Sequence, residues 1–176
     1  MYGEQVDLVS NELVNHIQLV EFYLRQLTGE VTRRGARHDE SKWSEEEWNL
    51  FLEYTPKLKN CTYGSPEYVQ YLKELKPALD HHYQCNSHHP EHHIGFDSGI
   101  KGMNLVDIME MLCDWLASTK RHADGDIFKS IEINQKRFGY SDDVKAILSR
   151  TAEFLVQQDK IAEFCESKEE EEDGSV

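Results

Sequence analysis

The chain lacks several features that would place it in a well-defined class of protein. Its 176 residues contain no run of about 18 apolar residues, so the sequence predicts no membrane span. The first segment, MYGEQVDLVSNELV, carries acidic residues and no basic stretch, which argues against a secretory signal. The cysteines are scattered without CxxC spacing, which predicts free thiols rather than a disulfide framework or a zinc ribbon: Cys61, Cys85, Cys113 and Cys165. We therefore expect a cytoplasmic protein that does not bind membranes.

An excess of positive charge is also missing. The chain has 19 basic and 33 acidic residues, with a formal net charge of −14. Residues 166–176 hold six acids and one lysine, which contribute −5 and leave −9 for the remainder of the chain. Because binding to duplex nucleic acid relies on a basic surface, we expect no duplex partner. A small anionic substrate is compatible with an acidic protein that binds metal ions, since these reverse the local field.

The apolar periodicity is helical throughout, and neither a strand pattern nor an internal repeat is present. Apolar residues at steps of three and four from Val6 to Leu27 predict one face of a long first helix, followed by a turn at Thr28–Gly29. Ser44, with Glu47 three residues later, has the pattern of a capping box and predicts the start of a further helix.

Other helix boundaries follow from local signals. Residues 54–66 read as a loop, after which Ser65 is the predicted N-cap of a helix that Pro77 should kink or split. Asn104 should cap the next helix, whose apolar stripe runs from Leu105 to Leu116, and two more helices follow. The sequence thus predicts an all-α, single-domain helical bundle over residues 1–165 and a disordered acidic tail over residues 166–176.

Histidine is plentiful, and eight of the nine histidines fall into an ordered series with aspartates. The series begins with His16, continues with the adjacent pair His38-Asp39 and a six-histidine segment from residue 81 to 93, and ends with Asp114. Neutral imidazole and carboxylate are the usual ligands of Mn, Fe, Co and Zn in proteins. The series therefore predicts a site for one or two divalent transition-metal ions. Taken singly, His16 fits a core histidine and the His38-Asp39 pair fits a charged helix start.

Within the histidine-rich segment the ligands are chosen by helical position. His82 continues the apolar stripe of Leu75 and Leu79, so it should face inward. We predict His82 and His88 as ligands and His89 as a group that contacts the substrate or supports a ligand. The choice among these and His81 stays open, and residues 92 and 93 are expected to be exposed to solvent.

Charged residues near these ligands complete the predicted site. Glu110 and Asp114 are four apart on one helix, and like charges at this spacing are unfavourable unless a cation lies near them. We interpret the pair as facing a metal, with a solvated helix face as the alternative. Lys42 lies over the same predicted face as His38-Asp39. Arg34 and Arg37 are candidate forked donors to phosphate oxygens, and a surface strip paired with acidic residues is the alternative.

The order of His16, His38-Asp39, a later histidine and Asp114 on a helical chain resembles the HD-domain superfamily of metal-dependent phosphohydrolases. Within it, RRGARHDESK, ALDHHYQCNSHHPEHH and MNLVDIMEMLCDW are similar to a family of short bacterial and phage proteins without an established activity. The resemblance implies a helical bundle with a metal site between helices, and hydrolysis of phosphate esters, often of nucleotides. It also implies that members with extra histidines are dinuclear, some of them iron oxygenases.

The predicted function is metal-dependent hydrolysis of a nucleotide or another small phosphorylated metabolite by a metal-activated water. The predicted metal ligands are His16, His38, Asp39, His82, His88 and Asp114. Glu110 would orient the water or accept its proton, and Lys42 with Arg34 or Arg37 would neutralise charge on phosphate oxygens. The alternatives are a dinuclear iron oxygenase and a non-catalytic binder of a signalling nucleotide, and a homo-oligomer is left open.

Overall fold

The computed structural model describes residues 2–62, 65–93, 95, 99–121 and 125–173, with side chains described only within residues 5–160. Over these residues the chain is helical and contains no strand, which confirms the all-α prediction. No helix of the described part is both long and apolar enough to cross a membrane. The α-helices are α1 (Tyr2–Ala36), α2 (Glu45–Lys59), α3 (Pro66–Cys85), α4 (Leu105–Thr119), α5 (Ile127–Phe138) and α6 (Asp142–Asp173). Short 3-10 helices lie at η1 (Glu40–Trp43), η2 (Pro90–His92) and η3 (Ile100–Gly102).

Backbone contacts divide the chain into two compact units, Met1–Asn86 and Ser87–Val176. The first unit contains α1, η1, α2 and α3, and the second contains η2, η3, α4, α5 and α6. The division of the chain into one domain and a tail stays a prediction.

Helix α1 is longer than the sequence predicted, because the expected turn at Thr28–Gly29 does not form. The Thr28 hydroxyl donates to the Leu24 carbonyl at 3.0 Å, and the helix continues to Ala36. A glycine inside a helix weakens it by roughly 0.5–1 kcal/mol without ending it. The seven apolar residues of the predicted face, which we call the α1 stripe, are 44–63% exposed: Val6, Val9, Leu13, Ile17, Val20, Leu24 and Leu27.

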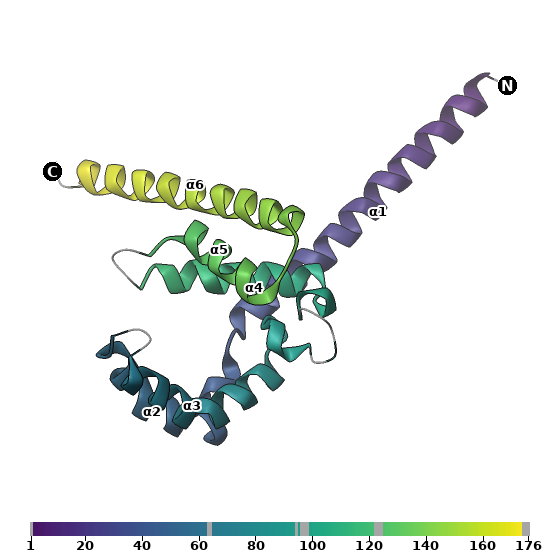
Figure 1. The fold of residues 1–176 in the computed structure, drawn as a ribbon. Helices are drawn as coiled ribbons and strands as arrows, with labels where there is room; N and C mark the ends of the chain where they lie inside the picture. Colours follow the sequence, from purple (N-terminus) through teal and green to yellow (C-terminus); the bar gives the residue numbers. More distant parts are fainter. Residues whose placement is uncertain (1, 63–64, 94, 96–98, 122–124, 174–176) are drawn as a thin grey trace. The chain divides into compact units, whose positions relative to one another are not determined.

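Helices α2 and α3 pack side by side and form the interior of the first unit (Figure 1). Tyr54 of α2 and Tyr71 of α3 lie with ring centroids 6.0 Å apart. The predicted N-cap of α3 is confirmed, since Ser65 accepts a hydrogen bond from the Tyr68 amide at 3.1 Å. Two predictions are wrong: α2 continues to Lys59 where a loop was expected, and α3 passes through Pro77 without splitting.

The second unit has an apolar core between α4, α5 and α6, and Figure 1 shows these helices in green to yellow. Its fully buried side chains include Met111, Leu112, Ile131, Leu148 and Ala152. Helix α4 starts with the predicted cap, and α5 and α6 lie where the sequence placed them.

The orientation of α4 differs in part from the predicted apolar stripe. Leu105 is 62% exposed and Met109 is 40% exposed, whereas Asp107 is buried. The side of α4 that carries carboxylates is therefore covered, as the metal-facing interpretation requires.

Helix α6 extends to Asp173 and so includes most of the acidic segment 166–176, for which the sequence predicted disorder. Glutamate is a good helix former, so the segment's composition is compatible with helix.

Candidate metal centre

Asp39 occupies an unusual backbone position directly after α1. It is the N-cap of η1 with φ 56 and ψ 22, the one positive-φ residue other than glycine in the described part of the chain. Left-handed backbone is unfavourable for most side chains, and aspartate tolerates it better than most. The Lys42 amide donates to the Asp39 carbonyl at 2.9 Å, and the Lys42 ammonium donates to Asp39 Oδ2 at 2.5 Å. The turn and the ion pair together hold the Asp39 carboxylate in place.

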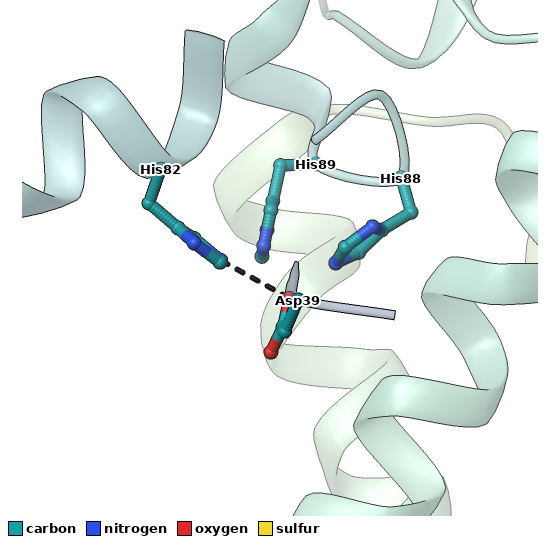
Figure 2. A group of neighbouring side chains, drawn as sticks. All are labelled: Asp39, His82, His88 and His89. Atoms are coloured by element: carbon teal, nitrogen blue, oxygen red, sulfur yellow. Dashed lines mark ion pairs between the residues drawn. The ribbon is translucent and has the colours of Figure 1, made fainter. Parts of the chain in front are cut away.

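His82 lies between two carboxylates inside the first unit. Its Nε2 is 3.3 Å from Asp39 Oδ1, the ion pair that the dashed line marks in Figure 2, and its Nδ1 is 3.0 Å from Glu47 Oε2. The His82 side chain is 4% exposed, which confirms the inward orientation predicted from the α3 stripe. Each ring nitrogen therefore faces an anionic oxygen.

Glu47 is a residue of this site that the sequence prediction missed. It is fully buried, and its second oxygen Oε1 lies 2.8 Å from His81 Nδ1. The predicted capping box with Ser44 does not form, because Ser44 makes no side-chain cap and the Glu47 carboxylate binds the two imidazoles instead. A signal was present: Glu47 precedes Phe51 by four residues, on the side of α2 that faces α3.

The neighbour of His81 on the next turn of α3 is a thiol. Cys85 Sγ lies 3.6 Å from His81 Nε2. Desolvation raises the pKa of the Cys85 thiol, and the negative charges of Glu47 and Glu46 raise it further. The thiol therefore stays protonated at neutral pH and is suited to donate to His81 Nε2.

The second unit contains a matching pair of a histidine and a carboxylate. His88 is 2% exposed, and its Nδ1 lies 3.1 Å from Glu110 Oε1 of α4. The prediction gave Glu110 a role on the attacking water, and the structure gives it a contact with an imidazole. The His89 ring lies 4.2 Å from the His88 ring, centroid to centroid.

The turn that carries His88 is fastened to α4 and to itself. The Ser87 hydroxyl donates to Asp107 Oδ1 at 2.7 Å, and His93 Nε2 lies 2.9 Å from the Ser87 carbonyl. His92 and His93 are half-buried, so the prediction that both are exposed is wrong. The reason is that His93 contributes to the hydrogen bonding that closes this turn.

Two groups of side chains in the described residues could hold a metal ion. The first is Asp39, His82, His88 and His89, drawn in Figure 2, and the second is His38, His88 and Asp114. They contain five of the six predicted ligands and add His89. The remaining predicted ligand, His16, is exposed on α1 and belongs to neither group.

Comparison with known proteins gives a family and no function. The model of a family of unknown function, DUF5662, matches residues 6–160. The chain belongs to DUF5662. No curated protein and no solved structure matches it.

In this DUF5662 member the predicted phosphate-binding arginines have acidic partners at the surface. Arg34 Nε lies 3.0 Å from Glu30 Oε1, and the Arg37 guanidinium lies 2.7 Å from Glu40 Oε2. These contacts fit the alternative interpretation, a surface strip of ion pairs, and a role in binding substrate stays a prediction. Hydrogen bonds from Arg33 and Arg34 lower the pKa of Glu30, which keeps this carboxylate charged.

Proposed function

We propose that the protein is a metal-dependent phosphohydrolase of HD type that acts on a nucleotide or another small phosphorylated metabolite. In this proposal a divalent transition metal is bound by Asp39, His82 and His88. The remaining coordination positions are filled from His38, His89 and Asp114, or by water.

The observation that carries the proposal is a repeated local arrangement. In each unit a buried histidine has its Nδ1 beside a carboxylate, His82 with Glu47 at 3.0 Å and His88 with Glu110 at 3.1 Å. Histidines that bind metals almost always donate their other ring N–H to a carboxylate, a carbonyl or water. The arrangement leaves Nε2 of each ring available as a ligand.

The spacing of two proposed ligands supports a shared ion. His82 Nε2 and Asp39 Oδ1 are 3.3 Å apart. Two ligands with bonds of about 2.0–2.1 Å to one tetrahedral ion are separated by about 3.3–3.4 Å. The contact is also longer than the usual N–H···O hydrogen bond of about 2.7–3.2 Å, so a hydrogen bond explains it less well than joint coordination does.

A metal at this position would supply the chemistry of phosphate ester hydrolysis, by acidifying a bound water and polarising a phosphoryl oxygen. Asp39 and the histidines would hold it. Lys42 already pairs with Asp39 Oδ2, so its first role would be to fix that carboxylate, and its ammonium would add positive charge for a phosphate beside the site.

The test starts from the full chain purified without added metal. Metal content is measured first, followed by uptake of Mn, Fe, Co and Zn and a turnover screen on nucleoside mono-, di- and triphosphates and sugar phosphates. Wild type should bind one to two equivalents of metal and hydrolyse at least one substrate class. Asp39→Asn and His88→Gln should lose both properties while remaining helical by circular dichroism.

The control variant is Asp159→Asn, which removes an exposed carboxylate paired with Lys120 and should leave metal and turnover unchanged. Wild-type protein that takes up none of the four metals would rule out the proposal.

A dinuclear iron oxygenase is the second candidate, because the two groups together offer six side chains, more than the four that a tetrahedral ion uses. Two iron equivalents with substrate-dependent oxygen uptake would favour it. A non-catalytic nucleotide binder is distinguished by recovery of the bound nucleotide unchanged after incubation with the metal-loaded protein.

A further inference from the structure

We infer that Glu47 is a positioning residue that fixes both His81 and His82 as the tautomer protonated on Nδ1, and so directs the Nε2 lone pair of His82 toward Asp39. The inference rests on the proposed function for its effect on metal binding. Its structural part, the tautomer, can be tested without metal.

The first step is that Glu47 needs two donors. It is fully buried, and a buried carboxylate is strongly unfavourable unless hydrogen-bond donors satisfy it. The two carboxylate oxygens lie 2.8 Å from His81 Nδ1 and 3.0 Å from His82 Nδ1. An ionised carboxylate only accepts hydrogen bonds, so both contacts require a proton on Nδ1.

The second step removes the other possible partners of His82 Nδ1. Asn86 Nδ2 is 3.1 Å away, but its two hydrogens have shorter acceptors, the Ser41 hydroxyl at 2.7 Å and the His82 carbonyl at 2.8 Å. Because a carbonyl only accepts, the contact with the His82 carbonyl also fixes which end of the amide is nitrogen. Ser41 Oγ lies 3.2 Å from Nδ1, farther than the carboxylate. The Nδ1 proton of His82 is therefore directed to Glu47.

The third step concerns the opposite side of the ring. A neutral imidazole protonated on Nδ1 presents a lone pair at Nε2, and in His82 this atom lies 3.3 Å from Asp39 Oδ1. Two facing lone pairs repel each other unless a cation lies between them. Glu47 thus converts the His82–Asp39 contact into a pair of ligand atoms, although Glu47 itself does not touch the metal.

The test uses apo protein labelled with ¹⁵N-histidine, treated with chelator at neutral pH. Long-range ¹H–¹⁵N spectra distinguish the two tautomers and the doubly protonated ring, and His81→Gln and His82→Gln variants assign the signals. His81 and His82 of the wild type should both be protonated on Nδ1 alone. A doubly protonated His82, or one protonated on Nε2, would overturn the inference.

Glu47→Gln tests the effect on binding. The glutamine amide can accept a hydrogen bond from only one of the two imidazoles, so at least one ring should change tautomer. Zn²⁺ affinity, measured by competition with a chromophoric chelator, should fall by about 10–100-fold, the usual effect of losing a group that orients a metal ligand. Glu47→Asp keeps the charge but withdraws it by one methylene, and should lose affinity to an intermediate extent.

Glu53→Gln is the matched control on the exposed side of α2, where Glu53 pairs with Lys57, and it should change neither tautomer nor affinity. If Glu47→Gln does not fold, the wild-type tautomer spectrum still decides the inference. If wild type shows the expected tautomers and binds no metal, the proposed function fails and the tautomer assignment stands. If Glu47→Gln keeps full Zn²⁺ affinity with a changed tautomer, Glu47 does not position His82 for metal.

Discussion

Asp39 allows the site and the scaffold to be separated by three substitutions at one position. Its φ of 56 is costly for an ordinary side chain, by about 1–2 kcal/mol, and carries no such penalty for glycine. Asp39→Ala and Asp39→Gly remove the same carboxylate and the same ion pairs. The two variants therefore differ almost entirely in the backbone term, and we expect the glycine variant to be more stable than the alanine variant by about 1 kcal/mol.

The lost ion pairs add a contribution common to both variants. Lys42, the partner at Oδ2, is 38% exposed, and exposed pairs contribute about 0–1 kcal/mol. Asp39→Gly should thus lie close to wild type in stability, and Asp39→Asn, which also tolerates left-handed backbone, should do so too. All three variants should lose metal affinity by at least about 100-fold, because a ligand contributes no less than the groups that orient it.

The assay is urea unfolding followed by circular dichroism, with chelator present so that bound metal does not add to stability. For a chain of this length, about 1 kcal/mol corresponds to a shift of roughly 2–4 °C in Tm. Equal stability of the alanine and glycine variants would refute the backbone argument. Wild-type metal affinity in Asp39→Asn would show that this carboxylate is not a ligand.

Three further outcomes follow from the second unit and the tail. Asp107→Ala should cost about 1–3 kcal/mol in urea unfolding, because Asp107 is buried and accepts the Asn104 amide at 2.9 Å; a loss below about 0.5 kcal/mol would contradict this. Tyr140→Phe removes a 2.6 Å hydrogen bond to the Ile131 carbonyl and should cost about 1 kcal/mol at neutral pH. Burial raises the pKa of Tyr140 to about 12, above its unfolded value of about 10, so its stabilising effect is complete below pH 10 and is lost as the pH rises toward 12. The difference between wild type and Tyr140→Phe, followed from pH 9 to 12, should therefore shrink. Deleting residues 166–176 should leave unfolding free energy and metal uptake unchanged, and reduced turnover per folded molecule would contradict that.

The helix boundaries that the sequence predicted correctly depend on local chemistry. Ser65 and Asn104 cap their helices through hydrogen bonds to amides two or three residues away, so residue type and position were sufficient. The turn at Thr28–Gly29 was wrong because a glycine only weakens a helix, and here the Thr28 hydroxyl bonds back to the preceding turn.

The site was predictable where a residue type has few other uses, and not where it has a common local one. Asp39 and His82 were identified because a His-Asp pair and an inward histidine on an apolar stripe are uncommon patterns. Glu47 was assigned to a capping box, since a glutamate three residues after a serine usually has that role. Its true partners are 34 and 35 residues away in the sequence, and such contacts follow only from the packing of α2 on α3.

Asp107 illustrates the same difficulty from the other side. On sequence alone it was an acidic residue of the first turn that needed no special role, and replacing it would have been expected to be mild. The structure gives it the full capping box with Asn104 and a hydrogen bond from Ser87, so it is part of the scaffold that holds the turn carrying His88. Asp107 is therefore unsuitable as a neutral control for Asp114.

The exposed α1 stripe bears on how the protein must be handled in solution. An apolar strip along a helix of 35 residues favours self-association, and the opposing force is the mutual repulsion of molecules that carry a net charge of −14. That repulsion vanishes near the isoelectric point of about 5.0 and is screened at about 1 M salt, where the Debye length is only about 3 Å. Acidic buffers and high-salt or ammonium sulfate steps should therefore bring the protein out of solution, whereas dilute buffers at neutral to mildly alkaline pH should keep it dispersed.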